Sequence, residues 1–253
     1  MKNVIKSFGF DYSKVTIITD NASNMVAAFR DRCSRVSCFA HYLNLVLIDM
    51  MAVKNVEFQT MITNCKALVR HFKHTGLQNK MQRTLKQQCP TRWNSTYAML
   101  DAILMQQDEV HDILNARKEL RYLYAVDKDL LASVVSFLEY FKSASERACA
   151  DTRPTLQLVV PMYHKLTAAC KDNDGDCDVV RDLKAKGRLA LESKVWLDTL
   201  HDFAAFLNPT MKGLTFIPPK RKKAALEYVT RMLVSLDDPA ETAQIDAPAE
   251  VCI

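Results

Sequence analysis

A short apolar run followed at once by an acidic residue constrains the fold of this chain more than any other feature. Residues 15–19 are rich in β-branched side chains, Asp20 and Asn21 follow, and apolar residues then recur at helical spacing from Ala22 to Phe29. This pattern predicts a buried strand that leads directly into a helix. Asp20 would then lie at the carboxyl end of the strand, where ligands and metal ions bind to open α/β sheets. The alternative is that Asp20 or Asn21 only caps the helix by accepting a backbone hydrogen bond.

A second strand and helix follow along the chain. Residues 35–39 can form the strand and residues 42–51 a strongly apolar helix, an order typical of a parallel sheet covered by helices. Two strands do not form a stable sheet alone, so this region is predicted to be part of a larger sheet. Helical periodicity then continues with few interruptions to residue 236. The sequence therefore predicts an α/β region followed by a large helical region.

Composition limits the class of protein. The 253 residues are 49% hydrophobic, which is enough for a substantial core. The 8 cysteines lack short paired spacings and the first residues lack the apolar core of a signal peptide, so we expect reduced thiols in the cytosol or nucleus. No apolar run is long enough to span a membrane, so no membrane partner is expected. The net charge of +5 permits a polyanionic partner.

Five segments, taken in order, resemble the central part of the hAT-family transposases and of their domesticated zinc-finger BED relatives. They contain the Thr-Asp-Asn, Cys-Phe-Ala-His, Thr-Arg-Trp, Pro-Thr-Leu and Leu-Asn-Pro motifs, and they span residues 14–25, 36–47, 88–100, 153–161 and 203–212. The resemblance implies a ribonuclease-H-like fold, of which this chain would hold only a part. We therefore expect a partial ribonuclease-H-like α/β core over residues 1–95 and an all-helical, insertion-like domain over residues 96–236. Residues 237–253 contain only acidic charges and are predicted to form a disordered tail.

The resemblance also assigns a role to Asp20. In the family, three acidic residues hold two Mg²⁺ ions that flank the scissile phosphate of DNA. Asp20 matches the second of these acids, and the first and third have no match in this sequence. A lone carboxylate binds Mg²⁺ only weakly. We therefore expect that this chain alone is not a nuclease and binds no cofactor, whereas Mg²⁺ is implied for an intact parent enzyme.

Two residue pairs are further candidates. Cys38 and His41 match a recurrent family motif, but structural zinc requires four ligands, so a structural role is favoured and no metal site is predicted. Arg92 and Trp93 match the family's Arg-Trp motif, in which an indole and a guanidinium suit a flipped nucleotide. The alternative for Trp93 is a large side chain that seals the junction between sheet and helices.

The densest positive run in the chain is the third candidate. It consists of Lys220, Arg221, Lys222 and Lys223. Such a run can contact phosphate or direct nuclear import, or it can be the solvated first turn of a helix.

Together these features predict a nuclear, transposase-derived protein that is catalytically incomplete and retains DNA binding or a transcription-regulatory role. DNA is the expected partner and a transposase-like protein a further one. The oligomeric state is left open, because the family's dimerisation segment has no match. One alternative is a fragment of an active Mg²⁺-dependent hAT transposase. A second is a helical adaptor that binds only proteins.

Overall fold

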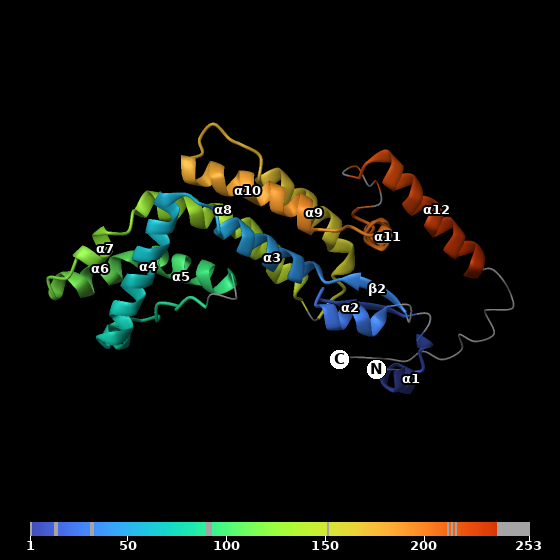
Figure 1. Cartoon of the computed structure of the whole chain (residues 1–253), viewed down its shortest axis with the longest axis horizontal. Coiled ribbons are helices and arrows are strands. Elements are labelled where there is room, and N and C mark those ends of the chain that lie inside the picture. The colour runs from blue at the N-terminus through green and yellow to red at the C-terminus, as the bar shows by residue number, and fades with distance from the viewer. Residues whose placement is uncertain are drawn as a thin grey trace. The chain divides into compact units, whose positions relative to one another are not determined.

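The computed structural model describes residues 2–12, 15–30, 33–89, 93–150, 152–211, 213, 215 and 217–236. Arg92 and the predicted acidic tail lie outside these ranges. Within them the chain is mostly helical, with one sheet of two strands (Figure 1). The prediction of a small α/β part within a mainly helical chain is confirmed at this level. The ribonuclease-H-like assignment stays a prediction.

Two compact units divide the chain, and neither is continuous in sequence. The first comprises Met1–Ala40, Glu146–Lys165 and Trp196–Ile253, and the second comprises His41–Ser145 and Leu166–Val195. The predicted boundary between residues 95 and 96 therefore falls inside the second unit. A boundary of this kind could not be read from periodicity, because the last helices group with the first strands.

The first unit begins with the predicted strand, helix and second strand. Its elements here are α1 (Lys2–Ser7), β1 (Thr16–Thr19), α2 (Ser23–Phe29) and β2 (Ser34–Ser37). The strands are parallel, with Ile18 opposite Val36, as a helical crossover requires. Only Thr19 and Val36 are buried in these strands, and Ile18 is 51% exposed. Parallel sheets are normally covered on both faces, so the described part of this sheet lacks a full cover.

The rest of the first unit is helical. It contains η3 (Leu156–Leu158), the start of α9 (Val159–Ala169), α11 (Thr199–Leu207) and α12 (Pro219–Leu236). Helix α11 packs against α12 (Figure 1). Their small apolar core consists of Val160, Ala205, Ile217 and Ala225. Helix α11 begins at Thr199 because the Asp198 carboxylate accepts a hydrogen bond from the backbone N–H of Leu200 at 2.8 Å.

The second unit holds the largest buried side chains. Its elements are α3 (Phe39–Met51), α4 (Val56–His74), η2 (Leu77–Lys80), α5 (Trp93–Met105), α6 (Gln107–Ala116), α7 (Arg121–Tyr124), most of α8 (Lys128–Ala148), and α10 (Asp178–Lys194). Phe58, Phe72 and Phe141 are among the side chains that are almost completely buried. Asp127 begins α8 by accepting hydrogen bonds from the N–H groups of Asp129 and Leu130, both at 3.0 Å. Across the described ranges, no helix has the length and apolar character needed to cross a bilayer.

Candidate functional site

Asp20 lies where the sequence predicts, directly after β1, and its side chain is exposed. Its Oδ1 accepts a hydrogen bond from the backbone N–H of Ala22 at 3.2 Å, just before α2 begins. This is the turn contact that aspartate commonly makes ahead of a helix. Asp20 therefore contacts the strand-to-helix turn, but it does not cap α2 as the alternative expected, because the N-cap residue is Ala22 and has no side-chain cap.

An arginine from the neighbouring strand occupies the same end of the sheet. Arg35 Nη1 donates to Thr19 Oγ1 at 3.0 Å and to the Asp20 carbonyl oxygen at 3.1 Å. Its Nη2 donates to Asn21 Oδ1 at 3.1 Å, and Ser37 Oγ donates to the same oxygen at 2.6 Å. The strand end is thus bound together by a guanidinium.

These residues do not fit a pair of Mg²⁺ ions. Mg²⁺ requires several oxygen donors in near-octahedral geometry, and the described residues contain no group of three His, Cys, Asp or Glu side chains that could hold a metal. The Arg35 guanidinium carries the same sign of charge as the ion and already binds the oxygen atoms of Thr19, Asp20 and Asn21. We therefore derive no metal-dependent step for this chain.

Cys38 and His41 lie on either side of the start of α3. Both are half-buried, and the backbone N–H of Cys38 donates to the Thr19 carbonyl oxygen at 2.7 Å. The pKa of the Cys149 thiol is raised, mainly by burial and further by Cys38. This backbone hydrogen bond ties the end of β2 to the end of β1, and the structural role of the Cys38 and His41 side chains stays a prediction.

Trp93, the first residue of α5, is only 4% exposed. Its ring packs edge-on against Tyr97, with centroids 6.3 Å apart. The Tyr97 hydroxyl donates to Glu139, and Lys142 Nζ lies 5.6 Å from the centroid of the Tyr97 ring. Base stacking requires an accessible face of the indole, which Trp93 does not offer here. The packing favours a structural role for Trp93 within the second unit, and its expected place at the junction between sheet and helices stays a prediction.

The positive run lies in the first turn and a half of α12, and its four side chains face different ways. Arg221 Nε and Nη2 donate to the two carboxylate oxygens of Asp202, both at 2.8 Å. Lys222 Nζ donates to the Gly213 carbonyl oxygen at 2.8 Å. Lys220 is exposed, and Lys223 has an 80% exposed side chain with its Nζ 3.8 Å from Glu227. Lys220 and Lys223 are therefore the exposed cations of the positive run.

Sequence reasoning missed the acidic partner of this run. Asp202 is 1% exposed and His201 is 2% exposed. Burial raises the pKa of the Asp202 carboxyl, and Arg221 opposes that rise. Asp202 precedes Ala205 by three positions, so it lies on the apolar face of α11. A carboxylate on an otherwise apolar helical face was the available signal that a cation must lie opposite.

The two histidines beside this pair predict a loss of stability in mild acid. Burial lowers the pKa of His201 below its ordinary value of 6.5, and burial together with Arg221 lowers that of His164. The unfolded chain therefore binds protons first, and the free energy of unfolding should fall as the pH drops below 6.5. Urea unfolding at pH 7.5, 6.5 and 5.5 tests this. The His164→Gln/His201→Gln variant should reduce the dependence of stability on pH, and the control His74→Gln, at an exposed position, should leave it unchanged. A wild-type free energy of unfolding that holds or rises toward pH 5.5 would contradict the prediction.

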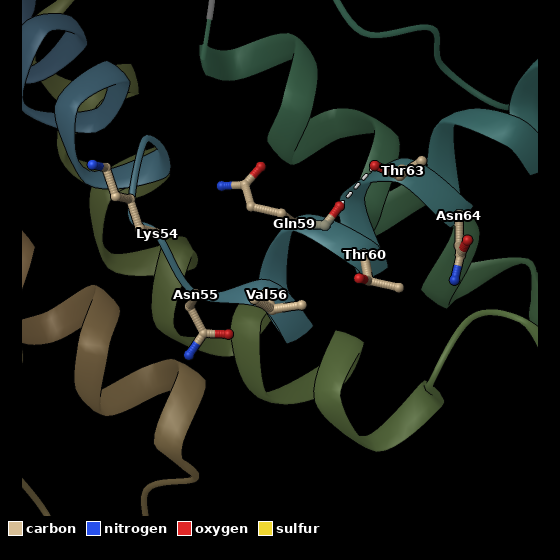
Figure 2. Close-up of a pocket in the computed structure, with 7 residues that line it drawn as sticks. All are labelled: Lys54, Asn55, Val56, Gln59, Thr60, Thr63 and Asn64. Atoms are coloured by element: carbon tan, nitrogen blue, oxygen red, sulfur yellow. Dashed lines mark hydrogen bonds between the residues drawn. The ribbon is translucent and has the colours of Figure 1, made fainter.

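Two hollows lie in the second unit. One, of about 450 Å³, is lined by the turn before α4 and the first turns of that helix (Figure 2). Three of its polar side chains have partners within the chain: Gln59 donates to the carbonyl oxygens of Met51 and Val53, Thr63 donates to that of Gln59, and Asn64 donates to that of Ala125. The other, of about 540 Å³, lies among α8, the α9–α10 loop and α10. A buried ion pair, between Lys184 Nζ and Asp176 Oδ2 at 2.5 Å, forms part of its wall.

Comparison with known proteins gives the family. The model of the ZBED1 RNase-like helical domain matches residues 36–137. The Transposable element Hobo transposase of Drosophila melanogaster is 30% identical over 83% of this chain and 32% of its own length. Human Zinc finger BED domain-containing protein 4 is 27% identical over 93% of this chain and 21% of its own length. Mouse Zinc finger protein 618 is 22% identical over 99% of this chain and 26% of its own length.

The chain thus spans a third or less of the length of these curated relatives. The matches cover both units, and the region matched by the family model includes Cys38, His41 and Trp93. The resemblance seen in the five sequence segments is confirmed by these independent matches. The chain is therefore similar to hAT-type transposases and to BED-type, transposase-derived proteins over the part that these matches cover.

Proposed function

We propose that this chain binds DNA in the nucleus as a non-cleaving part of a transposase-derived protein. The observation that carries the binding is the outward display of Lys220 and Lys223 at the start of the 18-residue helix α12. Cations at a helix N-terminus, where the backbone N–H groups and the helix dipole also favour negative charge, suit phosphate groups. Relatives named as a transposase and as a BED zinc-finger protein support a DNA partner.

The strand end supports the non-cleaving part of the proposal. Two-metal cleavage needs converging carboxylates, and Asp20 is accompanied by the guanidinium of Arg35. Asp20 also contacts its own turn through Oδ1. Asp20 therefore acts in this chain as a turn residue.

Binding to DNA should depend steeply on salt and should depend on the two displayed lysines. We expect the Lys220→Ala/Lys223→Ala variant to bind a fluorescent duplex more weakly and to lose about two units from the slope of log K against log salt, about one for each phosphate contact. Fluorescence anisotropy between 50 and 200 mM salt, roughly the range over which such contacts weaken, measures this. The Lys128→Ala/Lys171→Ala variant removes the same charge from exposed positions in the second unit and should keep the wild-type slope. Equal slopes for all three proteins would contradict the proposal.

Incubation with Mg²⁺ or Mn²⁺ provides the second arm of this experiment. Intact and pre-nicked transposon-end DNA should remain uncut at protein concentrations that saturate binding. Reproducible cleavage by the wild type that disappears in Asp20→Asn would show that Asp20 is catalytic.

One observation favours a second candidate, a fragment of an active transposase. The Hobo transposase match spans 83% of this chain but 32% of that protein. A longer in-frame coding sequence would favour this candidate if it adds, before residue 1, a strand that ends in an aspartate and, after residue 253, the third catalytic acid, a glutamate. Its activity would then be tested with the longer protein.

A further inference from the structure

Several contacts with α11 set the orientation of α12. Two of them lie one helical turn apart, and a third is the edge-on ring pair of Phe203 and Tyr228, with centroids 5.0 Å apart. Arg221 binds Asp202 of α11 through two hydrogen bonds, and Ala225 is completely buried in the core with Val160 and Ala205. Residues four apart lie on the same face of a helix, so these contacts together fix the rotation of α12 about its axis. These contacts hold one face of α12, from Arg221 to Tyr228, against α11.

This rotation decides where the displayed lysines point. At about 100° per residue, Lys220 and Lys223 lie about 60° apart, on the side of α12 away from Arg221. Lys223 is 80% exposed, and the Arg221 side chain is 33% exposed. A change in the rotation of the helix would move both ammonium groups together.

We propose that Asp202 is a positioning residue for the DNA contact: it holds Arg221 inward and thereby fixes α12 with Lys220 and Lys223 directed at the phosphates. Arg221, although it lies in the middle of the basic run, does not touch DNA. This inference rests on the proposed function and names the residue that sets its geometry.

The chemistry of the pair explains why Arg221 stays inward. Asp202 is 1% exposed, and a buried carboxylate that loses its cation is strongly unfavourable. The other charged or titratable groups that act on the Asp202 carboxylate are the Asp198 carboxylate and the ring of His164. Asp198 repels it, and His201 Nδ1 accepts a hydrogen bond from the Asp198 N–H at 2.9 Å, which requires an unprotonated nitrogen there. The planar guanidinium alone matches both carboxylate oxygens, and a lysine could not reproduce that fork.

A double-mutant cycle in the full chain tests the proposal. Arg221→Gln should weaken duplex binding by about tenfold, because Asp202 is left buried without a cation and α12 is released. The paired Asp202→Asn/Arg221→Gln variant should recover to within about threefold, with the wild-type salt slope, because two amides of similar shape restore the link at an unchanged net charge. Equal losses in both variants, with the slope reduced by about one, would show that Arg221 contacts phosphate and would overturn the proposal.

Hydrogen exchange of the α12 backbone amides gives a readout that needs no DNA. Arg221→Gln should speed exchange in α12, and the paired variant should return it to the wild-type rate. If exchange in Arg221→Gln is unchanged, the positioning role of Asp202 is overturned and the proposed DNA binding is unaffected. If the wild-type protein does not bind duplex DNA, the proposed function is overturned, and the DNA contact of Lys220 and Lys223 with it.

Discussion

Replacing Trp93 with alanine is expected to lower the free energy of unfolding by about 3 to 5 kcal/mol. The indole is 4% exposed and packs against Tyr97, whose hydroxyl in turn binds Glu139 of α8. Removing it leaves a cavity between α5 and its neighbours and frees the Tyr97 ring on one side. Urea unfolding followed by circular dichroism measures the change, with the slope m checked for two-state behaviour.

The second tryptophan provides a matched control. Trp196 is 75% exposed, so Trp196→Ala should change the free energy of unfolding by less than about 0.5 kcal/mol. A Trp196→Phe background leaves Trp93 as the only tryptophan, and its emission under selective excitation of tryptophan should be that of a buried indole until the protein unfolds. A Trp93→Ala protein of wild-type stability that binds DNA less well would instead assign Trp93 to base stacking.

Replacing Lys184 with methionine is expected to lower the free energy of unfolding by about 3 kcal/mol. Lys184 is 8% exposed, and its Nζ lies 2.5 Å from Asp176 Oδ2. Methionine fills much of the same volume but carries no charge. The Asp176 carboxylate then keeps one short contact, the backbone N–H of Asn173, and the more distant charge of Arg181. Urea unfolding at pH 7 measures the loss.

The acid range gives this prediction a second test. Burial raises the pKa of Asp176, but Lys184, the Asn173 N–H and Arg181 together hold it below its ordinary value of 3.8. The carboxylate therefore contributes stability above pH 3.8, and this contribution is lost as the pH falls through the folded-state pKa. That acid-dependent loss should shrink in Lys184→Met. The Lys184→Met/Asp176→Asn variant should recover most of the lost stability, because it removes the unpaired carboxylate. The control variant Lys171→Met, at an exposed position, should behave as wild type. No recovery in the double variant would mean that Lys184 acts through packing alone.

Local sequence patterns predicted much of the secondary structure. β-branched residues ahead of Asp20 predicted β1, and the apolar spacing over residues 42–51 predicted the buried face of α3. These features depend on neighbours within a few positions, which is the range over which backbone hydrogen bonding and side-chain spacing act. The break at Gln106 between α5 and α6 has no such local signal, since no Gly or Pro lies there.

The sequence by itself revealed the resemblance to hAT transposases, the order of strands and helices, and the positions of Asp20, Trp93 and the basic run. Only the tertiary structure decided which way those side chains face: Trp93 inward, Arg221 toward Asp202, and Arg35 across the strand end beside Asp20. The physical reason is that each orientation depends on a partner far along the chain. Asp202 lies 19 residues from Arg221, and Glu139 lies 42 residues from Tyr97. Such pairs gain their energy from burial and charge once the chain has folded, and no local pattern of residues encodes that gain.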